Sequence, residues 1–475
     1  MPFREKKTAS LVKRATSVRR GMWISTIEGA FATAHAALTG GAFFIGYALF
    51  LGANDTLLGI LAAVPFLAQA YQLVSAYITE RTGKVKAVTV VGGVASRLLW
   101  VFPIALLFIP GLSAGTRVAL FLAFYAVAYA LMFISYNAWT NWMSDLIPAR
   151  LRGRYFGSRN VAIVIVSLVV TLAAGVALDG FKAASREREG FATLFGVGVL
   201  AAAGAAVFIF KQPILPAKAG GAGAFAAKLR APLADGNFRR LLLFFATWHF
   251  SWALPLAFWT VHQLKYLGMS YFEISLFNVI IGLTSAVGSR VWGKITDRVG
   301  NKPVLVINAL AIAFLPLFWL APRPGALWPI WLIPFWAGTS WAGFSLATFT
   351  MPLALAPRET RNYYIAVFGI VTGAITFIGS ALGGIIAQYA AGYVWVLGGI
   401  TFMNYHMLFI VSAAGRFVSV LFLKGVREPK ATPVRAAVTF MGDALYDRLT
   451  AVTQIIPIPA WVRLPRRRNN DHESD

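Results

Sequence analysis

The chain has 475 residues, of which 58% are hydrophobic and only 13% are charged, and its mean hydropathy is +0.68. Soluble domains carry about twice that fraction of charged residues, so the composition indicates helices that face lipid. The chain has no cysteine, which excludes disulfides, thiolate metal sites and cysteine nucleophiles.

Apolar stretches long enough to cross a hydrocarbon core of about 30 Å follow one another along the chain. The first begins after a basic tail, and it is too long to be the apolar region of a signal peptide. The sequence therefore predicts an all-α membrane protein with about twelve transmembrane helices. The predicted spans are 22–51, 56–79, 87–111, 116–144, 160–179, 191–210, 239–264, 271–292, 304–321, 327–351, 362–387 and 405–424.

The net charge of +25 could indicate a nucleic-acid partner, but the positions of the cations favour another explanation. Most of the 43 lysines and arginines lie in the two terminal tails and in every second loop. Cytoplasmic loops retain such residues during membrane insertion. We therefore expect both termini to be cytoplasmic, the 180–190 segment to lie outside, and no nucleic acid to bind. The opposite side has only Arg117, Lys182, Arg186, Arg188, Lys265 and Arg323.

The longest internal connection lies near the middle of the chain and contains a run of alanine and glycine at 219–223. We interpret it as a linker between two half-domains rather than an ordinary loop. In the C-terminal tail, Val438, Met441, Leu445, Leu449 and Val452 recur at helical spacing, which predicts an amphipathic helix on the membrane surface. The predicted division is a tail (1–21), a first half (22–210), a linker (211–238), a second half (239–425) and a C-terminal tail (426–475).

A short motif occurs twice, each time after the second predicted span of a half. Residues 76–86 read AYITERTGKVK, and residues 293–303 read GKITDRVGNKP. The shared elements are an acid, an arginine and a glycine, which are Glu80, Arg81 and Gly83 in the first copy and Asp297, Arg298 and Gly300 in the second. The second copy also has Gly293 where the first has Ala76.

This repeat resembles the loop signature G-x-L-x-D-R-x-G-R-K/R of the major facilitator superfamily. The resemblance implies two pseudo-symmetric six-helix halves that move about a central cavity. A further pair of loops, SDLIPARLRGRYFG and LAPRETRNYYIA, aligns Arg152 with Arg361. Asp145 and Arg152 resemble the acid-x6-Arg element of that family, but the second half has Ala354 in place of the acid. We expect these charges to form a gate of ion pairs between the halves; the alternative is that they only set the topology.

Ionisable residues at membrane depth are candidate functional residues. Glu28 lies about two turns into the first span, and His35 follows seven residues later on the same face. The resemblance places the first and fourth helices of each half around the cavity, so both residues are candidates for solute binding or coupling. The alternatives for Glu28 are snorkelling to the interface or pairing with a structural arginine, and for His35 a packing role.

In the seventh span, His249, Trp252, Trp259 and Gln263 fall within one sector of a helical wheel, which predicts that they face a polar lumen. The alternative is that the aromatic rings of this face only contact lipid. His262 points elsewhere on the same wheel. For Arg97 and Arg416, within the third and twelfth spans, we expect structural pairing or lipid contact. Weaker candidates for the cavity are Asn137, Asn141, Trp336 and Thr339.

No P-loop and no metal-ligand spacing of histidines is found, so we expect neither an enzyme nor a cofactor or metal. We interpret the chain as a monomeric secondary transporter in the cytoplasmic membrane that moves a small organic solute by alternating access. Proton coupling and facilitated diffusion both remain open. The alternative function is a non-transporting membrane protein of the same fold, such as an assembly factor or sensor.

Overall fold

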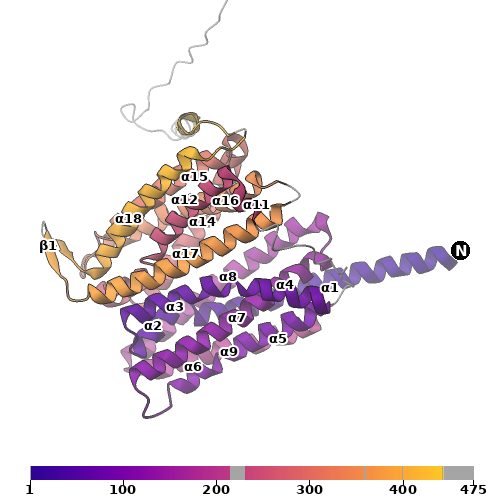
Figure 1. Ribbon diagram of the computed structural model, residues 1–475. Helices are drawn as coiled ribbons and strands as arrows, with labels where there is room; N and C mark the ends of the chain where they lie inside the picture. Colours follow the sequence, from indigo (N-terminus) through magenta and orange to yellow (C-terminus); the bar gives the residue numbers. More distant parts are fainter. Residues whose placement is uncertain are drawn as a thin grey trace, which may run out of the picture.

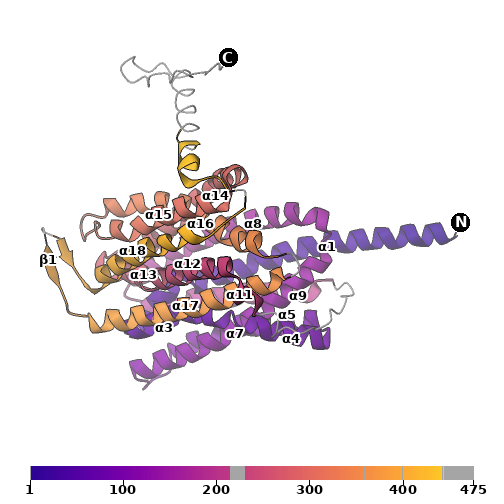
Figure 2. The same cartoon turned by 45° about the horizontal axis from the view of Figure 1, so that its top comes forward.

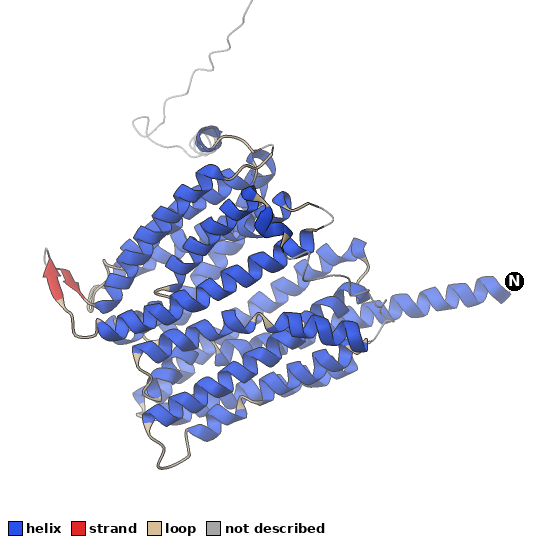
Figure 3. Ribbon diagram, in the orientation of Figure 1, coloured by secondary structure: helices blue, strands red, loops and turns tan. Residues whose placement is uncertain are grey.

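The computed structural model describes residues 2–213, 230–357, 360–397, 400–429, 431–440 and 442. Helices make up nearly all of this part of the chain, with one short hairpin (Figure 3). The first half consists of six spans, and several of them are built from two helices. They are α1 (Pro2–Thr39) with α2 (Gly41–Phe50), α3 (Asp55–Ala68) with α4 (Tyr71–Thr82), α5 (Val85–Leu98) with α6 (Val101–Leu106), α7 (Ala114–Leu146), α8 (Ala149–Ala183) and α9 (Glu187–Lys211).

The second half repeats this arrangement and adds short elements between its spans. These elements are α11 (Ala231–Ala234), α12 (Gly236–Ala253), α13 (Phe258–Val261), the π-helix η1 (His262–Tyr266), α14 (Tyr271–Val299), α15 (Asn301–Phe318), the 3-10 helix η2 (Trp328–Leu332), α16 (Ile333–Leu355), α17 (Arg361–Tyr389), α18 (Asn404–Phe422) and the 3-10 helix η3 (Leu423–Gly425). Strands β1 (Trp395–Leu397) and β2 (Ile400–Phe402) pair as an antiparallel hairpin.

Eleven helices of the described part are long and apolar enough to cross a membrane. Helix α16 spans 23 residues, lies tenth in chain order and completes the set of twelve. It is not one of those eleven, because tryptophan, glycine, serine and threonine interrupt its apolar sequence. The predicted all-α fold with about twelve transmembrane helices is therefore confirmed.

Side chains at the helix ends explain where the spans begin and stop. Asn54 and Ser113 accept backbone N–H groups of the first turns of α3 and α7, and Ser270 with Glu273 forms a capping box on α14. Gly83 ends α4 with a φ of 64°, a left-handed conformation that glycine adopts without steric cost. This explains the glycine in the first copy of the repeated motif.

The two halves lie side by side, with the indigo-to-magenta helices of the first half beside the magenta-to-yellow helices of the second (Figures 1 and 2). Helices α3 and α17 form the larger contact between the halves, and α8 with α14 forms the other. The loops at Gly83 and Gly300 define what we call the motif end of the bundle. The loops near Asn54 and Gly268 define the opposite end.

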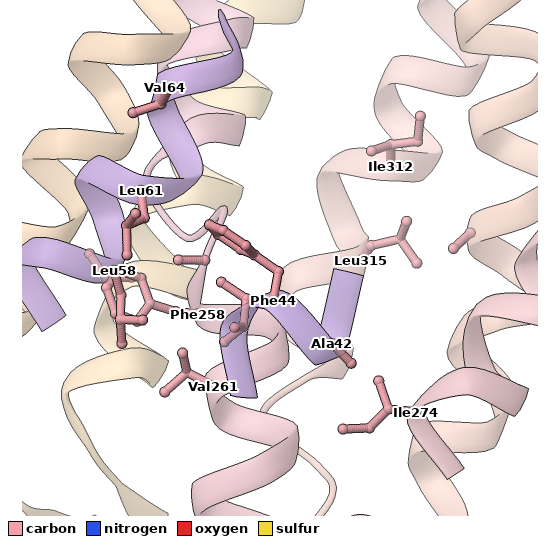
Figure 4. Close-up of a cluster of buried hydrophobic side chains, with 14 of the residues drawn as sticks. Ala42, Phe44, Leu58, Leu61, Val64, Phe258, Val261, Ile274, Ile312 and Leu315 are labelled. Atoms are coloured by element: carbon pink, nitrogen blue, oxygen red, sulfur yellow. The ribbon is translucent and has the colours of Figure 1, made fainter. Parts of the chain in front are cut away.

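Buried apolar side chains of both halves join in one cluster, part of which is drawn in Figure 4. Phe44 and Leu58 of the first half belong to it together with Phe258, Val261 and Ile274 of the second. Burial of such side chains from water contributes about 1.5–3 kcal/mol each in soluble proteins, and within lipid it is close packing that stabilises the contact. The two halves are therefore joined there by a packed, dry interface.

The end of the first half is held to its neighbours at the motif end. The Gln212 side chain donates to the Gly21 carbonyl at 3.0 Å, and Trp142 donates to the Pro213 carbonyl at 3.2 Å. The Lys86 ammonium donates to the Gln212 carbonyl at 2.9 Å. The central part of the predicted linker (214–229) and the tail from residue 443 lie outside the described residues, whereas residues 434–440 are helical.

Candidate solute cavity

A cavity of about 460 Å³ lies within the first half. Its walls come from α1, α5, α7, α8 and α9, and all of its lining residues fall between positions 28 and 209. Aromatic rings form much of the wall, and a small cluster of charged groups lies among them. The aromatic lining residues are Trp100, Tyr129, Phe133, Tyr136 and Trp139. Pockets of this size and composition are typical of small-molecule sites.

The charged cluster consists of Glu28, Arg97 and Arg159. Glu28 is 3% exposed, and its Oε1 lies 3.2 Å from Nη2 of Arg97. Its Oε2 lies 3.9 Å from Nη2 of Arg159. One carboxylate therefore faces two guanidinium groups, so the cluster has a net charge of +1. A buried carboxylate needs such partners, because an unpaired charge at this depth is costly.

Arg159 is positioned by three further features of the sequence. Its Nε donates to the Ser25 carbonyl at 3.3 Å, and its guanidinium lies over the Trp139 ring at 4.7 Å from the ring centre. Position 29 is glycine, and a Cβ there would meet the Arg159 guanidinium. Gly29 thus provides the space in which Arg159 reaches α1.

His35 also lines the cavity and is only 5% exposed. Its Nδ1 lies 2.9 Å from the Gly198 carbonyl of α9, so Nδ1 carries the proton in this hydrogen bond. The ring meets Trp100 edge-on, with centroids 6.0 Å apart. His35 therefore links α1 to α9 while contributing to the cavity wall.

The structure brings two of the four candidates of the seventh span together: the rings of His249 and Trp252 meet edge-on, with centroids 6.0 Å apart. His249 contacts the Thr376 hydroxyl at 3.0 Å, and Trp252 meets Phe66 of the first half. Trp259 instead stacks on Phe409 inside the second half, with centroids 4.2 Å apart. Gln263 is 3% exposed, and none of these four residues lines the cavity.

The remaining cavity candidates also lie elsewhere. Asn137 has a buried Oδ1 with no hydrogen-bond partner among the described residues, and Asn141 is exposed. Trp336 is 44% exposed and donates to the Ala311 carbonyl, and the Thr339 hydroxyl donates to carbonyls of its own helix. Only Glu28 and His35 of the predicted cavity set line the cavity.

Arg159 directly precedes the predicted span 160–179, so from the sequence it counts as a loop cation and is not among the predicted cavity residues. For Arg97, the sequence predicts structural pairing or lipid contact, and the structure provides the pair. The signal that could have found both partners was Glu28 itself, because a carboxylate at this depth requires a cation nearby.

The predicted gating residues lie at the motif end, where they make local contacts. Arg81 donates to the Tyr77 hydroxyl at 2.8 Å, and Arg152 donates to the Ile147 carbonyl at the end of α7. Arg298 lies 5.7 Å from the centre of the Phe440 ring. Among the described residues, no ion pair joins the two halves at this end. The other members of the predicted gate are Glu80, Asp145 and Asp297, all exposed, together with Arg361 and the glycines Gly83, Gly293 and Gly300.

At the opposite end, two carboxylates of the first half bind the second half. Asp55 accepts the Tyr405 hydroxyl at 3.1 Å and the Asn404 side-chain amide at 3.3 Å. Asp179 accepts the backbone N–H groups of Tyr271 and Phe272, both at 2.8 Å. Those N–H groups begin α14, where the helix dipole also favours a negative charge. We call Asp55 and Asp179 with these partners the latch; the sequence did not predict it.

Glycine contacts show how far the contact between halves extends. A Cβ at Gly175 would meet the backbone of Phe272, and one at Gly59 would meet Gly384. At the motif end, a Cβ at Gly153, Gly157, Gly293 or Gly369 would meet no atom within 4 Å. Close contacts between the halves therefore lie toward the opposite end, and these four glycines of the motif end have open space beside them.

Two halves of six membrane helices that contact each other toward one end, with an aromatic cavity in the first half, form an arrangement that is typical of secondary transporters. The family profile described as Major Facilitator Superfamily matches residues 29–380. The chain belongs to this superfamily and is a multi-pass membrane protein.

Solved structures of similar fold are transporters, at sequence identities that support the fold alone. A mutant of the nucleoside transporter NupG has a TM-score of 0.68 and 12% identity, covering 86% of this chain and 100% of that chain. A D-xylose-proton symporter has a TM-score of 0.65 and 14% identity, covering 87% and 99%. The inward-open xylose transporter XylE from E. coli has a TM-score of 0.62 and 15% identity, covering 89% and 99%. No curated protein matches the chain.

Proposed function

We propose that the chain is a secondary transporter that moves a small organic solute by alternating access, with the cavity around Glu28 as its solute site. The observation that carries the proposal is this cavity together with the latch that joins the halves at the opposite end, whereas no ion pair of the described residues joins them at the motif end. An assembly that is closed at one end needs only to exchange which end is closed in order to carry a solute across.

We further propose that the motif end is cytoplasmic and that the protein lies in the cell membrane. The tails and the loops at this end carry most of the lysines and arginines, as is typical of cytoplasmic segments. In this orientation the described state is open to the cytoplasm. The exposed Asp297 and Arg298 would then form ion pairs between the halves only after the motif end closes. Such pairs are worth about 0–1 kcal/mol each, weak enough to break in every cycle.

Transport is tested in proteoliposomes with a panel of labelled sugars, nucleosides, amino acids and organic acids. A cross-linked variant is compared with the unlinked protein. It carries cysteines in place of Asn54 and Gln388, which line one pocket at the opposite end. A bis-maleimide linker between them should abolish flux, because the latch can no longer open. The absence of native cysteine makes this reaction specific. If no solute of the panel crosses although the protein is folded, a non-transporting role is favoured instead.

Proton coupling is tested with Glu28→Gln, which keeps the shape and hydrogen bonding of the side chain but removes its titration. If Glu28 carries the proton, the variant should still exchange solute across the membrane but lose accumulation driven by a pH gradient. Accumulation at the wild-type rate under that gradient would show that Glu28 serves only its arginine partners, and His35 or His249 would be tested next.

A further inference from the structure

The ionisable groups of the cavity do not balance in charge. Its lining contains one carboxylate, Glu28, and two guanidinium groups, those of Arg97 and Arg159; the remaining titratable lining residues are His35, Tyr129 and Tyr136, which are neutral at pH 7 in their ordinary forms. An excess positive charge in a poorly hydrated wall is unfavourable unless an anion compensates it.

The two arginines differ in how they engage Glu28. Arg97 is within hydrogen-bond distance at 3.2 Å, whereas Arg159 at 3.9 Å is not. The carboxylate is therefore bound chiefly by Arg97. Within the described part of the chain, Arg159 makes one hydrogen bond, from Nε to the Ser25 carbonyl, so its Nη donors remain unused. Its side chain is 14% exposed, so it is available to a solute in the cavity.

The wall beside Arg159 suits a flat apolar body. Trp139 lies under the guanidinium, and Tyr136 stacks with Trp139 at an interplanar angle of 24°. Tyr136 is 55% exposed, so this aromatic surface is open. A planar ring can stack on such a surface, and a guanidinium can bind a carboxylate through two parallel hydrogen bonds.

We infer that the solute is an organic monoanion with a planar, apolar body, whose carboxylate is bound by Arg159 and whose ring packs beside Tyr136 and Trp139. The inference rests on the proposed function, because it names the solute class of the same cavity. The net charge of +1 matches a single negative charge on the solute. The cavity volume of about 460 Å³ suits a small ring system.

The test measures binding to the full-length purified protein by calorimetry with three probes of one shape: 2-naphthoate, 2-naphthamide and 2-naphthylmethylamine. We expect 2-naphthoate to bind at least about tenfold more tightly than either of the others, as a single charge-assisted contact provides. Weaker or equal binding of 2-naphthoate, or no binding of any probe, would overturn the inference.

Variants assign the preference to Arg159. Arg159→Gln should remove it, and Arg159→Lys should retain part of it. Arg154→Gln is the matched control, because Arg154 is an exposed arginine on the same helix, and it should leave the preference unchanged. Gly29→Ala should weaken 2-naphthoate binding without changing the charge, because the added Cβ displaces the Arg159 guanidinium. A preference that survives in both Arg159→Gln and Gly29→Ala contradicts the inference.

The binding test and the transport test can fail independently of each other. If 2-naphthoate is preferred but no solute crosses the membrane, the site stands and the proposed function fails. If the protein transports a solute of the panel but shows no preference for the anion, the transporter proposal stands and the solute class is wrong.

Discussion

At the scale of single residues, the most informative group is Glu28, a carboxylate at membrane depth with two cationic partners. Its position in the first span is readable from the sequence, but its partners lie 69 and 131 residues further along, at Arg97 and Arg159. Contacts between residues so far apart in the chain depend on how the helices pack. A single sequence does not show which helices are neighbours. The candidate residue was therefore found, whereas its role in a charged cluster was not.

The cluster makes a prediction about stability. Glu28→Ala leaves two guanidinium groups without a counter-charge and should lower the free energy of unfolding by about 3 kcal/mol. Arg97→Ala should cost less, because Arg159 remains to compensate Glu28. Thermal unfolding in detergent measures both variants. A loss in Arg97→Ala that equals or exceeds that in Glu28→Ala would show that the second arginine does not share the carboxylate.

At the scale of elements, the seventh span shows where a uniform helical wheel stops describing the helix. The wheel assumes 100° per residue without interruption, but Pro255 has no N–H to continue the hydrogen bonds of α12, which ends at Ala253. A π-helical turn at 262–266 changes the rotation again. His249 and Trp259 therefore point to different neighbours, and His262, which the wheel directed elsewhere, lies in the core beside His406.

The latch gives a prediction for the α8–α14 contact. Asp179→Asn removes the negative charge from the beginning of α14, where such a charge is worth about 1 kcal/mol. The variant should therefore shift the population about fivefold toward the state that is open at the opposite end. The distance between spin labels placed on cysteines at positions 54 and 391 reports this shift. Glu189→Gln is the control, because Glu189 pairs only with Arg186 of its own half and should leave the distances unchanged.

At the scale of the whole molecule, much of the architecture could be predicted from the sequence. Long apolar stretches predict membrane helices because the backbone must satisfy its hydrogen bonds within lipid, and the repeated Glu80 and Asp297 motifs mark equivalent places in the two halves. Which end of the bundle is closed could not be predicted, since it depends on small differences in free energy between two packings of the same helices.

The topology predicts the result of labelling in whole cells. A single cysteine introduced at Arg186 should react with a membrane-impermeant maleimide added outside, since loop 184–186 lies at the end opposite to the motifs. A cysteine at Arg81 should react only after the membrane is permeabilised. Labelling in the reverse pattern would invert the proposed orientation.

In the proposed transport cycle, the two halves must also come together at the motif end. Asp297→Asn or Arg298→Ala should slow transport by several-fold while leaving the melting temperature within about 1 °C of wild type, because both side chains are exposed. Transport at the wild-type rate in both variants would reduce the second motif to a marker of topology.

The anchoring of Gln212 and Pro213 to the first half has a mechanical consequence. When the halves rock, the connection can begin to change shape only beyond Pro213, because Gly21, Lys86 and Trp142 hold the preceding residues. From there to Arg230 the chain is long enough to reach about 60 Å when fully extended. The connection between the halves therefore does not limit their motion. The latch and the helix contacts limit it instead.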